Sequence, residues 1–353
     1  MAVSQLFSGP TAASARAATQ QFGRGAVYQM PGAPTDRHTL PQTMTAARIV
    51  QLGPPEIISV ADVDVPEPGE LEVLVRVSAA GVGPWDGLVR TGRSGLPSAP
   101  PLTLGAEISG VVEKLGVNVT GFAPGDEVFG STNSMFINGY AEYAVAAARM
   151  IAKKTSGLSH IEAAAMPVVG VMAWQMLFDH AAVREGQTVV IHGAAGNVGV
   201  YAVQLARAKK LRVVATVRNG DANYVRSLGA DDVINTDTDN LADFARRADA
   251  VIDTVGGASQ TQLFALLKPG GVIVSSVSQP SRLLAQQKRV RADYFIVDVN
   301  AAQLARLAQM RADGELIVPV GSVLPLAEAR AAHEMLAGTR AHNRGKIVLR
   351  VGE

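Results

Sequence analysis

Apolar residues are spaced in one pattern in the first half of this chain and in a different pattern beyond about residue 160. From Met44 onward, short apolar or alternating runs are separated by proline- and glycine-containing turns such as Pro66-Glu67-Pro68-Gly69. Short strands with regular turns between them are typical of a compact, β-barrel-like domain. The runs predict strands at residues 47–52, 57–63, 71–80, 108–115 and 127–130.

Beyond residue 160, helical and strand-like segments alternate. The spacing of apolar positions predicts helices at 161–180, 201–210 and 326–337. Strands that alternate with helices form parallel βαβ units, so this part of the chain is expected to be a doubly wound sheet. A last strand, 346–351, is expected to return to the first domain. The strands of the sheet are expected near residues 188–193, 211–217, 232–235, 250–254 and 272–276.

These patterns predict an α/β protein with two domains. The barrel-like domain spans 44–168 and is completed by 322–353, and the doubly wound domain spans 169–321. Residues 1–43 differ from the rest, because Met1 to Thr35 contains arginine but no acidic residue. Such a composition is typical of a disordered tail and also of an organelle transit peptide. We expect a disordered extension, with organelle targeting or an arm used in oligomer contacts as open alternatives.

Composition narrows the classes of protein. The chain has 353 residues, of which 48% are apolar, and this is enough for two cores. Lys and Arg number 32 against 31 Asp and Glu, so nucleic acid is not expected as an obligatory partner. Cysteine is absent, which rules out disulfides and thiolate zinc sites and fits a reducing cytoplasm. No apolar run approaches the roughly 18 residues of a membrane span, so no membrane association is expected.

The most informative segment is Thr188–Gly199, where a strand pattern runs into a glycine-rich turn and then a helix. Ala194, Gly196 and Gly199 stand where the motif G-x-G-x-x-G has its three glycines, with alanine in place of the first. In such a turn, backbone N–H groups at a helix N-terminus meet the pyrophosphate of a dinucleotide. The predicted cofactor contacts are Ala195, Gly196, Asn197, Val198 and Gly199.

The strand that follows the turn ends at Arg218 and Asn219. An acidic residue at this place binds the ribose 2′-hydroxyl of NAD, whereas an arginine suits the 2′-phosphate of NADP. Arg218, with its neighbour Asn219, therefore predicts NADP. Asp221 lies close enough to compete as the acidic residue that would favour NAD.

Further motifs give the chain a resemblance to a known family. The segments that carry it are Ala80–Asp86, Leu104–Gly110, Gly125–Val128, Gly139–Tyr143, Ala194–Gly199, Leu228–Asp231 and Arg344–Lys346. Over residues 44–353 the chain resembles the medium-chain dehydrogenase/reductase superfamily, specifically its zinc-free, zeta-crystallin-like quinone oxidoreductase branch. The resemblance implies a GroES-like barrel domain, a Rossmann domain and a homodimer.

The resemblance also shows where zinc ligands are missing. In the zinc alcohol dehydrogenases, a cysteine stands at the position of Gly83 and a histidine at the position of Ala106, and both bind the catalytic zinc. Neither Gly83 nor Ala106 has a side chain that can bind a metal. The resemblance therefore implies a protein without zinc, and metal-assisted alcohol oxidation is disfavoured.

Other site residues are implied by their positions after strand ends or in the C-terminal tail. Ligands bind outside the carboxyl ends of the strands in open α/β sheets. The implied candidates for the substrate pocket are Trp85, Arg90 and Tyr140, and no catalytic acid or base can be assigned. The implied cofactor contacts are Thr254, Val255, Gly256, Val277, Ser278, Asn343, Arg344 and Lys346.

Without zinc, the substrate itself has to accept the developing negative charge. In an enone, enal or quinone, conjugation spreads this charge onto a carbonyl oxygen, and the nicotinamide supplies the hydride. We therefore expect a cytoplasmic, NADPH-dependent reductase of small conjugated carbonyl compounds or quinones. An enoyl-thioester reductase and a non-catalytic NADPH-binding protein remain open alternatives.

Overall fold

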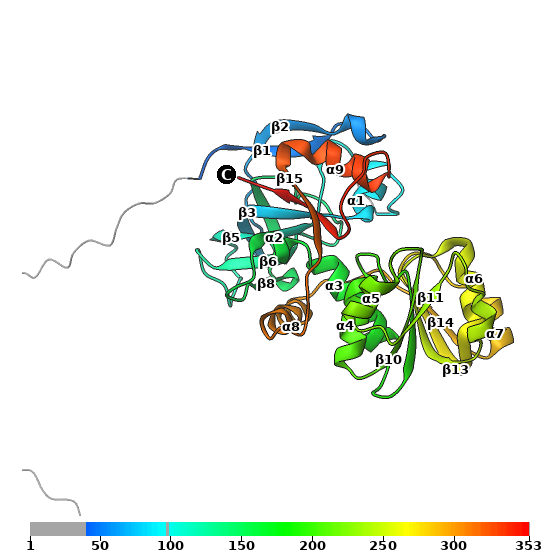
Figure 1. Ribbon diagram of the computed structural model, residues 1–353. Coiled ribbons are helices and arrows are strands. Elements are labelled where there is room, and N and C mark those ends of the chain that lie inside the picture. The colour runs from blue at the N-terminus through cyan, green and yellow to red at the C-terminus, as the bar shows by residue number, and fades with distance from the viewer. Residues whose placement is uncertain (1–39, 97–98, 353) are drawn as a thin grey trace, which may run out of the picture. The chain divides into compact units, whose positions relative to one another are not determined.

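The computed structural model describes residues 40–96 and 99–352 of the chain (Figure 1). The expectations for an N-terminal extension concern mainly residues 1–39, which lie outside the described residues. The first strand, β1 (Thr43–Ile49), begins next to Met44, the expected start of the folded protein. In Figure 1 the blue and cyan strands lie together with the red C-terminal strands, and the green-to-yellow segment forms a second sheet.

Strands from both ends of the described chain build the barrel domain. β1 pairs with β2 (Ser59–Asp64) and β4 (Leu102–Thr103) in a three-stranded antiparallel sheet. In a second, seven-stranded sheet, the tail strand β16 (Lys346–Arg350) pairs antiparallel with β3 (Glu72–Val82), so the C-terminal tail is part of this domain. Its order is β15 (Val320–Pro325), β16 (Lys346–Arg350), β3 (Glu72–Val82), β5 (Glu107–Leu115), β6 (Glu127–Ser131) and β8 (Ile151–Lys153), with β7 (Tyr143–Ala147) also paired with β3.

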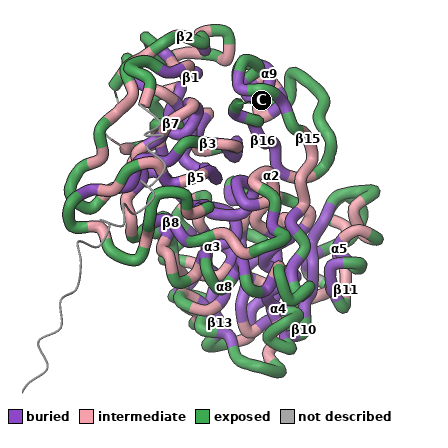
Figure 2. Tube along the Cα trace, turned by 90° about the vertical axis from the view of Figure 1, so that its left-hand side faces the viewer, coloured by how far each residue is buried: buried purple, intermediate pink, exposed green. Residues whose placement is uncertain are grey.

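The alternation of apolar residues explains the core of the barrel. Val73, Val75 and Val77 of β3 are at most 3% exposed, because every second side chain of a strand points to the same face. Ile347 and Leu349 of β16 belong to the same buried cluster, so the tail fills the core of the barrel. Figure 2 shows buried segments in the interior of the molecule, whereas the outer loops and β2 are exposed or intermediate.

The expected doubly wound sheet is confirmed. Its six strands are all parallel, and the strands inside the sheet, such as β9 and β10, are nearly continuous apolar runs because both of their faces are covered. Val189 and Ile191 of β9 share a cluster with helix α4 (Gly199–Ala208), whereas Val190 shares one with α6 (Gln260–Leu263). The spatial order is β11 (Asp232–Asn235), β10 (Arg212–Val217), β9 (Thr188–His192), β12 (Ala248–Asp253), β13 (Leu267–Ser275) and β14 (Arg291–Tyr294).

The helix predicted at 161–180 is wrong as a single element. Proline has no backbone N–H and therefore cannot continue the hydrogen-bond ladder of a preceding helix, but it is well tolerated in the first turn of a new one. Pro167 accordingly begins a second helix, and the end of the segment winds more loosely as a π-helical turn. The observed elements are α2 (His160–Ala164), α3 (Pro167–Trp174) and the π-helical turn η3 (Gln175–His180).

The other helices and short helical turns connect these strands. Among the described residues, no helix has both the length and the apolar character that crossing a membrane requires. The remaining elements are α1 (Pro84–Arg90), α5 (Ala222–Leu228), α7 (Arg282–Lys288), α8 (Ala301–Ala312) and α9 (Ala329–Leu336), and the turns η1 (Pro55–Ile57), η2 (Ala148–Met150), η4 (Leu241–Phe244), η5 (Gly257–Ser259), η6 (Phe264–Leu266) and η7 (Leu326–Glu328).

Candidate functional site

The glycine-rich turn joins β9 to the N-terminus of α4. Gly193, with a φ of +80°, makes the tight turn, one residue before Ala194, to which the sequence motif assigns the first glycine. A Cβ atom on Gly199 would lie 2.2 Å from the carbonyl oxygen of Gly193, so only glycine lets the helix pack this closely on the strand end. Gly196 is exposed, and a Cβ there would meet only the Gly193 oxygen, at 3.3 Å. The outer side of the turn is therefore open to a pyrophosphate at the helix N-terminus.

A buried histidine holds this turn against the neighbouring strands. His192, the last residue of β9, contacts the hydroxyl of Thr216 through Nδ1 at 2.7 Å and that of Ser259 through Nε2 at 3.0 Å. Burial lowers the pKa of His192, so the ring is neutral and donates through one nitrogen while accepting through the other. The hydroxyl of Thr254 donates to the carbonyl oxygen of His192 at 2.7 Å. Sequence analysis missed His192, although it directly precedes the turn.

The structure brings the two predicted strand-end loops together with this turn. A Cβ on Gly193 would lie 2.6 Å from both Thr254 Oγ1 and Val255 Cγ2. Thr254, Val255 and Gly256 follow β12, and Val277 and Ser278 follow the adjacent β13. The side chains of Val255 and Val277 are 49% and 50% exposed, which is unusual for valine beside a buried sheet.

Two arginines that the sequence places near the cofactor are exposed, Arg218 after β10 and Arg344 in the C-terminal tail. Arg344 forms an ion pair with Asp221 and lies over the ring of Tyr224, with its guanidinium carbon 4.5 Å from the ring centroid. Asp221, the residue that could favour NAD, is therefore already paired with a cation.

The neighbours of these arginines are polar and exposed. The backbone N–H of Asn219 donates to Asp237 at 2.9 Å. In the tail, the exposed Asn343 donates its backbone N–H to the hydroxyl of Ser322 at 3.3 Å. Both predicted residues therefore lie at the protein surface, with backbone N–H groups already used within the protein.

In the barrel, the position of the first missing zinc ligand is covered by an aromatic ring. A Cβ on Gly83 would lie 2.2 Å from the indole of Trp85. The other position, Ala106, is fully buried. The ring of Trp85 also contacts Phe136, with centroids 6.4 Å apart. No cluster of three or more His, Cys, Asp or Glu side chains suited to a metal occurs in the described part of the chain.

Lys346, expected from the resemblance to contact the cofactor, is instead buried in the barrel. Its ammonium group forms an ion pair with Glu107 of β5 and lies 4.3 Å from the centroid of the Trp85 ring. The other oxygen of Glu107 accepts the backbone N–H of Val168 at 2.8 Å, at the start of α3. The side chain of Lys346 is 2% exposed, so its charge serves Glu107 and Trp85 and has no surface for a ligand.

Tyr140 also lies inside the barrel, which corrects its expected place at the pocket surface. The hydroxyl of this fully buried residue donates to Asp86 Oδ2 at 2.7 Å, and the backbone N–H of Gly83 donates to the same oxygen at 2.8 Å. Burial raises the pKa of Asp86 to about 7 and raises that of Tyr140 well above its ordinary value. Tyr140 therefore fixes the start of α1.

Arg90 has a structural environment as well. Its Nε donates to Nδ1 of His333 in α9 at 3.2 Å, and its Nη1 donates to the carbonyl oxygen of Gly53. Burial lowers the pKa of His333 to about 3, so the ring is neutral and can accept this hydrogen bond. Arg90 is 6% exposed, and of the three predicted pocket residues Trp85 alone keeps intermediate exposure.

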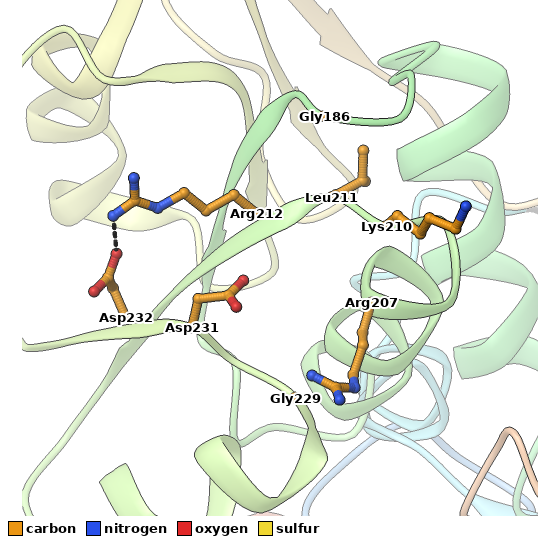
Figure 3. Close-up of a pocket in the computed structure, with 8 residues that line it drawn as sticks. All are labelled: Gly186, Arg207, Lys210, Leu211, Arg212, Gly229, Asp231 and Asp232. Carbon is orange, nitrogen blue, oxygen red and sulfur yellow. Dashed lines mark hydrogen bonds and ion pairs between the residues drawn. The ribbon is translucent and has the colours of Figure 1, made fainter.

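A cavity of about 610 Å³ lies on the doubly wound domain, at the other edge of the sheet (Figure 3). Arg212 and Asp232, which begin β10 and β11, form an ion pair at 2.6 Å beside it. Ligands of parallel sheets bind at the carboxyl ends of the strands, so this cavity is not the dinucleotide site. Its lining residues are Gly186, Arg207, Lys210, Leu211, Arg212, Gly229, Asp231 and Asp232.

The barrel, the parallel sheet and the glycine-rich turn together define a dehydrogenase or reductase of the alcohol dehydrogenase type. Two family models match the chain: an alcohol dehydrogenase GroES-like domain over residues 69–156 and a zinc-binding dehydrogenase over residues 228–349. Gly83 and Ala106 lie outside the residues that the zinc-binding dehydrogenase model matches, and neither has a side chain that can bind a metal.

Comparison with individual proteins identifies the family within this class of dehydrogenases and reductases. The chain is 32% identical over 323 residues to a quinone oxidoreductase of Sus scrofa, which covers 87% of this chain and 97% of the relative. The solved quinone oxidoreductase of Coxiella burnetii superposes with a TM-score of 0.82 at 33% identity, covering 88% of this chain and 100% of that one. A solved NAD-dependent alcohol dehydrogenase superposes with a TM-score of 0.78 at 32% identity, with the same coverage. The chain belongs to the quinone oxidoreductase family of the medium-chain dehydrogenase/reductase superfamily and is an oxidoreductase.

Proposed function

We propose that this protein is a zinc-independent oxidoreductase that uses NADPH to reduce a conjugated carbonyl compound or a quinone. The observation that carries the proposal is the arrangement at Gly83, where the space of a metal ligand is taken by the indole of Trp85. Together with Ala106, this leaves no donor atom for a catalytic zinc at either position. The residues present at these two positions therefore do not fit a zinc ion.

The residues present do fit a dinucleotide phosphate. The open turn at Gly196 and the N-terminus of α4 would hold the pyrophosphate. Arg218 and Arg344 would hold the 2′-phosphate, because both are exposed cations at the end of β10 and Asp221 is already paired with Arg344. One structural relative is described as NAD-dependent, so the preference between the two cofactors requires a direct test.

The chain's own contribution to the reaction is binding and orientation. NADPH, when bound, supplies the hydride. The exposed apolar side chains of Val255 and Val277 offer a surface against which a planar ring can be oriented, and Trp85 offers a wall on the barrel side. In a conjugated substrate, charge moves onto a carbonyl oxygen and is neutralised by a proton from water. No side chain is required as an acid or base in this scheme.

A substrate panel tests the proposal against its alternatives. Purified protein is mixed with NADPH and, in turn, with enones, enals, quinones and a crotonyl thioester, and the loss of nicotinamide absorbance is followed. Turnover of enones, enals or quinones, above that of the thioester, supports the proposal. Preference for the thioester would favour an enoyl-thioester reductase. NADPH binding without turnover of any compound would favour a non-catalytic NADPH-binding protein.

Assembly and location are proposed from the family alone. We propose a homodimer located in the cytoplasm that acts on small molecules and needs no nucleic acid. Sedimentation equilibrium of the full chain tests the dimer, and a monomer at micromolar concentration would contradict it.

A further inference from the structure

One buried carboxylate holds the first of the two loops that carry Val255 and Val277, the surface proposed above for the planar nicotinamide ring. Asp253 is the last residue of β12 and is fully buried. Its Oδ1 accepts the backbone N–H of Val255 at 3.1 Å and that of Gly256 at 2.9 Å. These two hydrogen bonds fix the loop as it leaves the strand.

The other oxygen of Asp253 reaches the second loop. Oδ2 accepts Nε2 of Gln260 at 2.8 Å and the hydroxyl of Ser275 at 3.0 Å. Gln260 Nε2 also donates to the carbonyl oxygen of Ser278 at 2.9 Å, and the Ser275 hydroxyl accepts the backbone N–H of Val277 at 3.3 Å. A carboxylate has about four acceptor sites, and all four are used here.

The two loops also touch each other directly. A Cβ on Gly256 would lie 2.8 Å from Ser278 Oγ and 2.9 Å from Val277 Cγ1. The half-exposed side chains of Val255 and Val277 therefore flank the same glycine, with the polar network buried beneath them. Rigid support from below keeps an apolar surface in place that would otherwise have to be ordered when a ligand binds.

We propose that Asp253 is a positioning residue for the nicotinamide half of the cofactor, acting through both loops without touching the cofactor. This inference rests on the proposed function, since it assumes that the loops face the nicotinamide. The adenosine half is bound elsewhere, by the turn at Gly196 and by Arg218. Loss of the Asp253 network therefore weakens ligands that contain nicotinamide and spares ligands that lack it.

The experiment compares two ligands by calorimetry: NADP+, and 2′,5′-ADP, which has the adenosine half alone. D253N replaces one acceptor oxygen by an NH2 group, which opposes the donors of Gln260 or of the loop. The expected result is an affinity for NADP+ about tenfold lower with an unchanged affinity for 2′,5′-ADP. Bound NADPH should also lose part of the fluorescence enhancement that a rigid nicotinamide site gives.

Asp249 provides the matched control. It lies near the start of β12, at the opposite end of the strand from Asp253. There it accepts the backbone N–H of Thr188 at 2.8 Å and pairs with Lys268 at 2.9 Å. D249N should leave both affinities unchanged. Q260M keeps the volume of Gln260 but removes its hydrogen bonds, so it should reproduce the selective loss even where D253N fails to fold.

The outcomes separate this inference from the proposed function. If folded D253N or Q260M lost affinity equally for both ligands, or lost affinity for neither, the role of Asp253 would be overturned. Preference of the wild type for NAD+ would instead refute the NADPH proposal. In that case NAD+ and 5′-ADP replace the two ligands, and the same comparison still decides the role of Asp253.

Discussion

The indole ring of Trp85 packs directly against Gly83 and leaves no room for a side chain there. The indole lies where any side chain at position 83 would have to go, and Lys346 lies 4.3 Å from the centroid of the ring. Gly83 has no side chain, and the neighbouring Trp85 ring fills the volume that a side chain there would need. A close-packed interior has few voids, so the two residues have to change together.

Gly83→Ala tests this fit. The new methyl group, 2.2 Å from the ring, must displace Trp85 and should lower the free energy of unfolding by about 1–3 kcal/mol, measured by urea denaturation. Gly87→Ala is the matched control, because it lies in α1 with nothing within 4 Å of its Cβ and should not destabilise. Equal destabilisation by both changes would contradict the proposed overlap.

Arg218→Ala tests the cofactor preference. Loss of a charge-assisted contact with the 2′-phosphate should weaken NADPH binding about 10- to 100-fold and leave NADH nearly unchanged, as measured by fluorescence titration. Arg212→Ala is the control, since Arg212 is exposed at the opposite end of the same strand and pairs with Asp232. If Arg218→Ala weakens the binding of NADPH and NADH equally, Arg218 does not bind the 2′-phosphate.

At the level of elements, two helices begin at buried carboxyl groups. Asp86 accepts the N–H of Gly83 at the start of α1, and Glu107 of β5 accepts the N–H of Val168 at the start of α3. The Glu107 cap joins the barrel to the first helix of the doubly wound domain. Because Glu107 and Lys346 are both buried, neither charge has water to replace its partner.

Glu107→Gln tests this pair while keeping the shape of the side chain. It removes the carboxylate that forms the ion pair with the buried ammonium group of Lys346 and should lower the free energy of unfolding by about 3–5 kcal/mol. The double variant Glu107→Gln, Lys346→Met should recover much of the loss, because a neutral buried pair carries no uncompensated charge. Additive losses in the double-mutant cycle would show that the two groups are not coupled.

The pH dependence of stability reports on the start of α1. Burial raises the pKa of Asp86 from 3.8 to about 7 in the folded state. Below pH 3.8 both folded and unfolded states hold the proton; between 3.8 and about 7 only the folded state holds it. The stability that this group contributes is therefore lost as the pH rises through this window. The unfolding free energy of the wild type relative to Asp86→Asn should fall from about pH 4 to pH 7 and then level off, and a rise would contradict this.

At the level of the whole molecule, the sequence predicted the fold class and the family because both depend on periodicity and on local motifs. Most strand positions follow from apolar runs of the right length, and the turn at Gly193–Gly199 follows from its glycines. The break at Pro167 was missed, since a helical pattern continues on both sides of the proline. The burial of Lys346 and Tyr140 was missed as well, because each is paired with a residue distant in the chain, and spacing alone carries no sign of such contacts.

The candidate site also combines features that local sequence motifs predict with features that depend on the folded sheet. The glycine-rich turn joins a strand to a helix as the motif indicated, although Gly193 and not Ala194 makes the tight turn, and the network around Asp253 depends on which strands are neighbours in the sheet. β12 lies between β9 and β13, so Asp253 lies beside both loops, and this order is a property of the folded chain. Sequence spacing gave no signal for Gln260, which reaches back to Asp253 from the following helix.

The proposed independence from metal concerns the whole molecule and can be tested on it. Gly83 and Ala106 offer no donor atoms, so incubation with EDTA or 1,10-phenanthroline should leave the NADPH-dependent activity unchanged, and mass spectrometry of metals should find less than one zinc per ten chains. A zinc alcohol dehydrogenase treated in the same way is the control and should lose its activity. Loss of activity on chelation, with recovery on adding zinc, would mean that other side chains bind the metal. A metal bound by the protein could then stabilise the negative charge on the substrate oxygen, and the substrate would no longer have to be conjugated.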